Sequence, residues 1–511
     1  MGQPSNVTIN IIDNTIGVST PEKGIVFVQG ITQRGPVNDP KDLITSARQF
    51  KLMFGDDGGD FTLLCLRMLA KGVVLRVNRI TDGTGVIAIS DPFVSGVNAL
   101  FAFASKYPGA DYNSISVEVL AASNGLTNYF DLKVTHSSDP LVSEYYPNLT
   151  ITGTPTIATS TYLADVVKNS KFIDPIYKNL STLTAPLRPT NAVFTLGSDT
   201  IGTSGVAPDA ADFIGDATTK TGLRAFDSYD DAYILACPDL DEDSYVGLPE
   251  AGEAYALLRG DLIYFQHLSN SYLSSTDLLA ARPNINSSNI LFTAGGLLIT
   301  HPETGAVYET SELGDVIAAA VAVHNKLGEW RSFTGQSFGV LPNTLGVVNN
   351  FGTPAQLADL RLLAHRQVNM AVRKNGLTYL NDDYTGMMDP SALNFASIKF
   401  MVLFVSRSLR PTLEKFLGYP NTFSTWEKIY YTVKPFLEGM VSKEAWFSYD
   451  WQGDQFVTSL NNLQVNDAVD VTAGKYRARL HVVGIAPLKD FYLDFILDNG
   501  ANAGVSVVSG N

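Results

Sequence analysis

The chain has 511 residues, of which 45% are hydrophobic and 17% are charged. A chain of this length and composition can bury large cores, and at typical domain sizes it holds about two to four domains. Its 36 Lys and Arg residues stand against 51 Asp and Glu residues, which gives a formal net charge of -15. Because no Lys/Arg-rich run stands apart from this acidic excess, we expect no binding of nucleic acid.

Cysteine usage and the N-terminus indicate the compartment in which the chain works. Cys65 and Cys237 each lie in an apolar stretch, where a cysteine behaves as a small hydrophobe, so we expect no disulfide and assembly in a reducing cytosol. Residues 1–15 lack the basic start and the apolar core of a signal peptide, and apolar runs such as 400–405 are too short to cross a bilayer. We expect neither export through a signal peptide nor insertion into a membrane.

The first ninety residues combine an isolated strand with an α/β pattern. Residues 7–13 alternate in the manner of a β-strand but have no hairpin partner nearby, which indicates an extended arm. The residues that follow predict a buried strand, a short helix opened by a Ser46–Gln49 capping box, a second helix and a second strand, over 24–31, 46–54, 60–71 and 73–80. This order of strand, helix, helix and strand is typical of an α/β fold.

Between residues 88 and 205 the composition shifts towards Ser, Thr, Asn and Gly. Short alternating segments are found over 114–122, 129–136 and 148–154. They predict an all-β domain that is inserted into the α/β one. Helical and apolar patterning resumes over 223–240, where a helix leads into a buried strand.

Four helices are predicted in the second half of the chain. They cover 315–326, 355–373, 394–410 and a stretch that contains Trp426 and Leu437. Ser424 and Glu427 form a candidate capping box for the last of these helices. Pro411 is expected to end or bend the third helix, and Pro435 is expected to kink the fourth.

The C-terminal pattern returns to strands, over 476–488 and 491–497, and residues 499–511 contain one more β-prone run without a local partner. Both ends of the chain therefore carry unpaired strands. Their backbone donors and acceptors need partners, and a sheet on a neighbouring molecule supplies them most simply. The alternative is a pair of disordered tails, which are usual at termini, and composition does not decide between the two.

One motif is typical of a hydrolase. Residues 335–339 read G-x-S-x-G, with His365 and His481 further on, which is the chain order of an α/β-hydrolase with Ser337 as its nucleophile. A nucleophile elbow must lead into a helix, whereas Pro342 here favours a loop. We therefore prefer a structural loop to an esterase.

Other chemical signals are weak. The acidic run 239–243 offers several carboxylates to a cation, but it lacks the spacing and the glycine of an EF-hand loop, which favours a solvated loop. The six histidines are scattered singly, without a Cys/His cluster, and no P-loop motif is present. We expect no catalytic residue, no cofactor and no metal ion.

Several segments, taken in order, resemble a known family. The N-terminal part has an apolar strand, a G-P-V turn, an aromatic-FG helix end and a V-x-R-V strand, followed by a glycine and an asparagine ahead of a further strand. These segments and those of the second half are 24–55, 73–80, 104–119, 327–341, 366–382, 400–429 and 471–497. Their order resembles the contractile-tail sheath family of phages, pyocin-like particles and related secretion machines.

The resemblance implies an α/β (α+β) core domain that is built from both halves of the chain, with an inserted β-rich outer domain and extended N- and C-terminal arms. The corresponding segments are an N-terminal arm over 1–20, a first part of the core over 21–87, the inserted domain over 88–205, a second, tube-facing part of the core over 206–498 and a C-terminal arm over 499–511.

The resemblance also implies that each arm adds a strand to a sheet of a neighbouring subunit. The residues expected to take part in this strand exchange are Val7, Ile9, Ile11, Val505, Val507 and Val508. The residues expected to form the host sheet for a neighbour's arms are Leu480, Val482, Tyr492, Leu493 and Phe495.

The implied function is structural and not enzymatic. The subunit would polymerise as stacked hexameric rings around a tail tube and contract to drive the tube through the target cell envelope. Its partners would be other copies of itself, the inner tail tube protein, and baseplate and tail terminator proteins, in a virion tail assembled in the host bacterial cytoplasm. Alternatives are the sheath of a phage-related secretion or pyocin-like injection machine, and a β-rich surface adhesin suggested by the Ser/Thr-rich insert.

Overall fold

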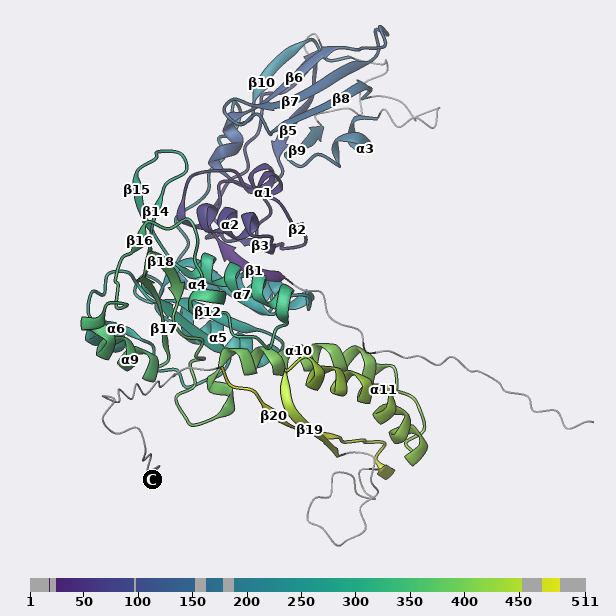
Figure 1. Ribbon diagram of the computed structural model, residues 1–511. Coiled ribbons are helices and arrows are strands. Elements are labelled where there is room, and N and C mark those ends of the chain that lie inside the picture. The colour runs from purple at the N-terminus through teal and green to yellow at the C-terminus, as the bar shows by residue number, and fades with distance from the viewer. Residues whose placement is uncertain are drawn as a thin grey trace, which may run out of the picture.

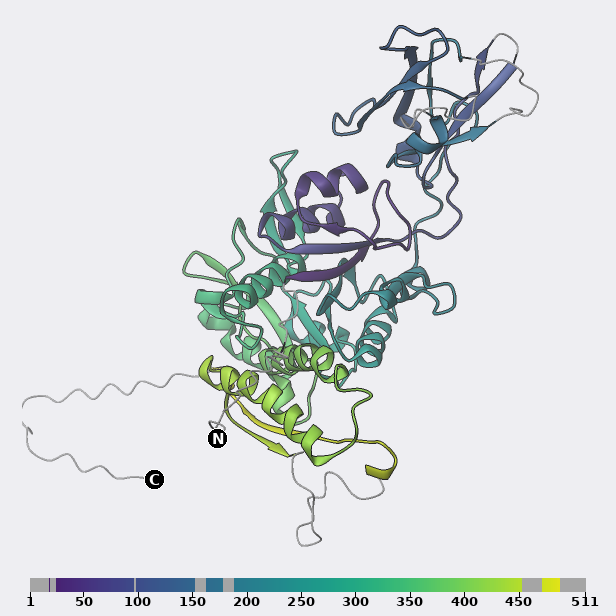
Figure 2. The same cartoon turned by 90° about the vertical axis from the view of Figure 1, so that its right-hand side faces the viewer.

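The computed structural model describes Val18 and residues 24–95, 98–151, 162–177, 188–452 and 471–487. A β-rich part lies at one end of a central α/β body, and a layer formed by two helices and a β-hairpin lies at the other end (Figures 1 and 2). None of the helices in this described part of the chain is long and apolar enough to cross a membrane.

The body is built on an eight-stranded sheet. Its strands follow the order β18 (Leu377–Leu380), β17 (Val368–Lys374), β13 (Ile290–Ala294), β12 (Ile263–His267), β11 (Ile234–Asp241), β1 (Ile25–Gly30), β3 (Val74–Arg79) and β2 (Leu43–Ile44). The inner strands are parallel, whereas β2 and β18 run antiparallel at the two edges. Strands from both halves of the chain thus share one sheet, and the predicted α/β class is confirmed.

Each face of this sheet carries its own apolar core, because strand residues alternate between the faces. Val26 and Val28 of β1 belong to one core, and Ile25 and Phe27 belong to the other. The first core is covered by α1 (Ala47–Phe54), α2 (Asp60–Ala70), α7 (Leu313–Leu327) and the first part of α10 (Ala396–Glu414). The second is covered by α4 (Ala210–Ile214), η3 (Gly222–Ser228), α5 (Leu248–Arg259), α6 (Ser275–Ala281) and α9 (Leu357–His365).

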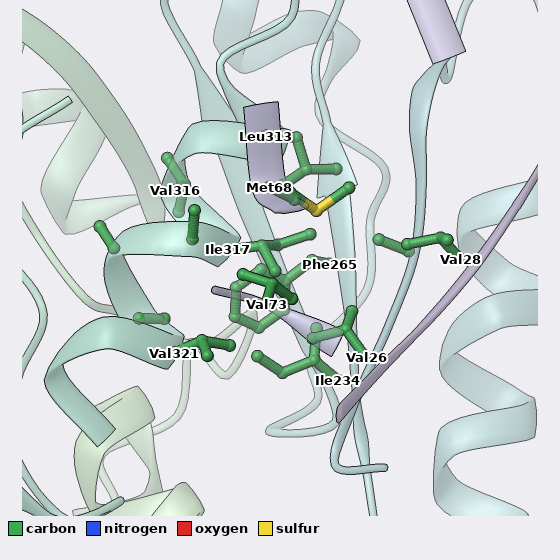
Figure 3. Packing of buried hydrophobic residues seen from close by; sticks show 14 of the residues in the cluster. Val26, Val28, Met68, Val73, Ile234, Phe265, Leu313, Val316, Ile317 and Val321 are labelled. Atoms are coloured by element: carbon green, nitrogen blue, oxygen red, sulfur yellow. The ribbon is translucent and has the colours of Figure 1, made fainter. Parts of the chain in front are cut away.

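Helix α7 illustrates how the sequence forms the first core. Leu313, Val316, Ile317 and Val321 recur at helical spacing and lie together with Met68 of α2 and the sheet residues (Figure 3). Full burial of such a side chain contributes about 1.5–3 kcal/mol. The predicted helix over 315–326 is confirmed.

Two antiparallel sheets form the β-rich part. One contains β4 (Phe93–Ser95), β5 (Asn98–Ser105) and β9 (Ile173–Tyr177), and the other contains β10 (Ala192–Thr195), β6 (Ile115–Ala121), β7 (Phe130–His136) and β8 (Ser143–Leu149). They enclose a third core, which is rich in phenylalanine and also takes in the short helix α3 (Leu163–Val167). The predicted boundaries of this domain, 88 and 205, remain a prediction.

The strands predicted over 114–122 and 129–136 are confirmed as β6 and β7, whereas the strand predicted over 148–154 begins within β8, and its residues 152–154 lie outside the described residues. The strand that pairs with β7 is β8, which ends at Leu149. Asn148 has a φ of 57°, in the left-handed region, and it lies inside β8 where the pairing with β7 shifts its register.

The helix predicted over 355–373 is wrong in its second half. Helix α9 ends at His365, Gln367 has a φ of 62°, and residues from Val368 onward form β17 of the central sheet. Val368 and Val372 fit one face of a helix, but they fit a strand equally well. Burial in the sheet, which the local pattern does not contain, decides between the two.

Both helices that contain an internal proline run on past it. Helix α10 continues beyond Pro411 to Glu414, and α11 (Phe423–Ser442) continues seven residues beyond Pro435. Each proline removes one backbone donor, but buried side chains on either side hold the helix in place. The capping box predicted at Ser424 is wrong, because Ser424 lies inside α11. At Ser46 the side chain does cap α1, accepting from the backbone N–H of Gln49 at 3.3 Å.

Candidate assembly interface

The layer at the end of the body combines α10 and α11 with an antiparallel hairpin of β19 (Trp446–Gln452) and β20 (Arg479–Gly484). The helices bury one apolar face against the hairpin. The buried residues of this fourth core are Trp330, Ile398, Met401, Phe404, Val405, Leu409, Val433, Leu437, Met440, Ala445 and Trp446. In Figure 1 the hairpin lies below the two helices, on the side away from the central sheet.

The edges of this hairpin carry no further strand from the described residues. In the described part of the chain, β19 pairs with β20 and neither strand has a second neighbour. Leu480 pairs with Trp451 and Val482 with Tyr449, and all four side chains pack against the core of the layer. Open edges present unpaired N–H and C=O groups, which is the geometry that accepts an added strand.

The structure places two of the five predicted host residues, Leu480 and Val482, on β20. Tyr492, Leu493 and Phe495 lie outside the described residues. The partner strand β19 was not predicted from the sequence, although its aromatic run, WFSYDWQ, is typical of a strand.

The predicted arm residues, Val7, Ile9, Ile11, Val505, Val507 and Val508, also lie outside the described residues. Val18 is described, and it packs against the core of the layer. Val18 therefore lies beside α10, α11 and the hairpin.

The layer is anchored to the body through residues 329–331. Glu329 forms a buried ion pair with Arg407 of α10, whose guanidinium lies 4.8 Å from the ring centroid of Tyr233 in the body. The indole N–H of Trp330 donates to the carbonyl of Lys443 at 3.1 Å. A buried pair of this kind fixes the position of α10 against the sheet, because separating the charges would leave both without a partner.

The hydrolase-like motif does not form a triad in the described structure. Ser337 lies in α8 (Gly335–Phe338), a single helical turn, and its side chain is exposed. The predicted loop is confirmed over residues 339–345, which follow this turn, and no strand precedes the turn. His365 ends α9 and His481 lies on β20. The hydrogen bonds among the described residues do not connect Ser337 with either histidine.

The acidic run 239–243 is not the solvated loop that we predicted. Its first three residues are the end of β11, and Leu240 and Glu242 are buried. The carboxylate of Glu242 accepts from the backbone N–H of Ser269 at 3.1 Å, and burial raises the pKa of Glu242 to about 7. Over the described ranges, no group of three or more His, Cys, Asp or Glu residues is arranged to hold a metal ion.

Comparison with solved structures finds the same architecture in sheath proteins. The sheath tail protein of Listeria innocua aligns with a TM-score of 0.60 at 12% identity, over 91% of this chain and 96% of that chain. The sheath tail protein of Desulfitobacterium hafniense aligns with a TM-score of 0.57 at 15% identity, over 88% of this chain and 94% of that chain. The helical sheath of the anti-feeding prophage in its contracted state aligns with a TM-score of 0.57 at 12% identity, over 98% of this chain and 100% of that chain.

Comparison of sequences alone does not detect the similarity to these proteins. No protein-family model matches the chain, and no curated protein sequence matches it. The structural likeness nevertheless covers nearly the whole of both chains, including the β-rich part and the end layer. The chain has the fold of contractile sheath proteins.

Proposed function

We propose that the protein is the structural subunit of a contractile sheath, polymerising as stacked hexameric rings around an inner tube. The observation that carries this proposal is the alignment with sheath proteins over at least 88% of the chain. A likeness that extends over the central sheet, the β-rich part and the end layer together is specific to a whole architecture and not to one common motif.

Assembly proceeds through strand exchange at the open hairpin. A neighbour's arms, through Val7, Ile9 and Ile11 or through Val505, Val507 and Val508, add strands to the edges of β19 and β20. Main-chain hydrogen bonds supply the affinity, and the alternating side chains set the register. The open edges of the hairpin and the position of Val18 beside it support this assignment.

The arms remain paired during contraction, while the α/β bodies rotate and form new contacts with one another. The free energy comes from these contacts, multiplied over many copies, so no nucleotide and no catalytic residue is needed. The working domains are the arms over 1–20 and 499–511, the core over 21–87 and 206–498, and the outer domain over 88–205.

The remaining partners are an inner tube protein, which the core faces, and baseplate and terminator proteins at the two ends of the sheath. The machine is a phage tail that is assembled in the bacterial cytoplasm and drives its tube through the target cell envelope. A secretion or pyocin-like injection machine is the second candidate, because the anti-feeding prophage sheath shares the fold as fully as the sheath tail proteins do.

The proposal is tested by electron microscopy of the purified full-length chain, concentrated without a tube protein. We expect hollow helical sleeves. Dispersed monomers at every concentration, with and without an added tube protein, would contradict the proposal.

A further inference from the structure

An apolar groove opens where α10 ends and α11 begins. It has a volume of about 460 Å³ and is lined by side chains that include Leu413, Phe416, Trp426, Ile429, Trp451 and Leu480. Leu417 at its mouth is 78% exposed and Tyr419 is 49% exposed. Exposed apolar side chains beside an apolar hollow mark a site that another surface covers.

The rim of this groove is basic. The exposed cations on the segments that line it are Arg410, Lys415, Lys475, Arg477 and Arg479. Two exposed carboxylates, Glu414 and Asp450, lie on the same segments. Over residues 396–452 and 471–487 the layer carries ten Lys and Arg residues against five Asp and Glu residues, in a chain whose net charge is -15. The groove therefore favours an occupant that is both acidic and apolar.

Such a surface lies on the hairpin of β14 (Leu297–Thr300) and β15 (Val307–Thr310), which projects beyond the central sheet (Figures 1 and 2). Residues 302–307 are all exposed, and Val307 is 68% exposed. Glu303 and Glu309 are exposed as well, and neither has a salt-bridge partner among the described residues. The hairpin thus combines an exposed apolar side chain with unpaired carboxylates.

Two more carboxylates strengthen the negative potential at this hairpin. A Cβ atom at Gly58 would lie 3.1 Å from Oε2 of Glu303, so the loop that carries Asp57 touches the hairpin. The hydroxyl of Thr310 donates to Oδ1 of Asp60 at 3.2 Å. Both aspartates are exposed.

The groove and the hairpin lie at opposite ends of the parallel strands of the central sheet, the groove near their amino ends and the hairpin near their carboxyl ends. The α10 layer adjoins the amino edge, where Phe400 packs on Tyr233, the residue before β11, with ring centroids 5.7 Å apart. The hairpin follows the carboxyl end of β13 and begins at Leu297, three residues after Ala294. The two surfaces therefore cannot meet within one subunit, but they can meet between copies.

We propose that the exposed hairpin of one copy, through Val307, Glu303 and Glu309, docks into the basic-rimmed apolar groove of a second copy. The contact is heterologous, because it joins two different surfaces, so its repetition generates rings or helices and not closed dimers. The inference rests on the proposed self-assembly and names one of its contacts, separate from strand exchange.

Cysteine cross-linking tests this contact. The native Cys65 and Cys237 are both buried, so a Val307→Cys, Leu417→Cys chain presents its two new thiols alone at the surface. With a short thiol-specific cross-linker we expect a ladder of dimers, trimers and longer covalent chains on a denaturing gel. Each single variant is the matched control and is expected to stop at dimers or below.

Absence of the ladder, whether or not sleeves form, would overturn the docking contact. Sleeves without the ladder would leave the proposed sheath function standing, whereas a ladder without sleeves would support the contact and count against that function. A Leu417→Cys thiol that is shielded from a maleimide in the monomer would show that the chain's own residues fill the groove, which also contradicts the proposal.

A charge swap tests the electrostatic part of the contact. In the cross-linking chain, Glu303→Lys with Glu309→Lys is expected to lower the yield of trimers and longer species several-fold, and Arg410→Glu with Lys415→Glu is expected to do the same. The four changes together are expected to restore the ladder, because the charges again attract. Failure of this rescue in a folded chain would overturn the pairing of these two surfaces.

Discussion

Nη1 of Arg34 lies 2.8 Å from Oδ2 of Asp111, an ion pair that joins the α/β body to the β-rich part. The Arg34 side chain is 1% exposed, and its guanidinium also pairs with Asp139, in the turn between β7 and β8. The remaining donors reach the body, where Nη2 donates to the carbonyl of Lys51 at 2.8 Å. One buried side chain therefore contacts both parts of the molecule.

We predict that Arg34→Met loosens this junction. The change leaves Asp139 without its cation and Asp111 with only His136 beside it, and breaking a buried pair costs up to about 3–5 kcal/mol. Urea unfolding is expected to show the loss, and hydrogen exchange is expected to rise at Asp111 and Asp139 before it rises in the central sheet. Arg48→Met is the control, because Arg48 is exposed and has no ion pair in the described structure. Equal stability of the two variants would contradict the role of Arg34.

A pair of glycine substitutions tests the packing of the first core. A Cβ atom at Gly30, the last residue of β1, would lie 2.2 Å from the ring of Phe61. Gly30→Ala is therefore expected to lower the free energy of unfolding by about 1–3 kcal/mol, the usual cost of overpacking. A Cβ atom at Gly439 in α11 would have no neighbour within 4 Å. Gly439→Ala is therefore expected to raise the free energy of unfolding by up to about 1 kcal/mol. Urea denaturation measures both, and a stabilising Gly30→Ala would refute this packing.

The buried carboxyl of Glu242 predicts a pH dependence of stability. Because burial raises its pKa from 4.5 to about 7, the folded state holds the proton more tightly than the unfolded state does. This contribution is fully present below pH 4.5 and is lost as the pH rises through about 7. The contribution amounts to at most about 3.5 kcal/mol.

Glu242→Gln is expected to remove this pH dependence of the free energy of unfolding. The difference in unfolding free energy between parent and variant is expected to move in the variant's favour as the pH rises from 4.5 to 7.5. Burial opposes the charge on His267, but Glu312 and, to a smaller extent, Glu242 raise the pKa of His267, so the difference reports Glu242 together with its coupling to this histidine. The exposed Glu250→Gln is the control. Parallel stability curves for the parent and Glu242→Gln would show that the carboxyl is not protonated in the fold.

Strand exchange predicts the behaviour of truncated chains. Deletion of residues 1–18, or a stop after Gly500, removes one arm and leaves the described cores nearly intact. We expect a folded monomer that does not polymerise, with an unchanged circular dichroism spectrum and a single sedimenting species. Normal sleeves from either truncation would refute the role of that arm.

The sequence predicted those elements whose pattern fits one structure only. Residues 60–71 and 73–80 form the expected helix and strand, because helical and alternating patterns separate clearly there. Val368 and Val372 fit both patterns, so only the neighbouring strand β13 settles that they lie in a sheet. Strand β20 of the end-layer hairpin is predictable from the sequence, because its apolar and polar side chains alternate. Its partner β19 is not, because it follows a helix whose end the local pattern does not mark.

The groove and its charge could not be predicted from the sequence. Leu413, Trp451 and Leu480 come from three elements that meet only in the fold. The same holds for the ion pair of Arg67 with Asp315, which is separated by 248 residues. Such contacts depend on how the layers stack, and no local pattern contains that information.

The most direct test of the account is a helical reconstruction by cryo-electron microscopy of sleeves formed by the full-length chain. We predict six subunits per ring around a hollow centre, with additional strands from neighbouring copies beside β19 and β20. A reconstruction in which both hairpin edges stay unpaired, or a chain that forms only closed dimers or monomers, would contradict assembly by strand exchange.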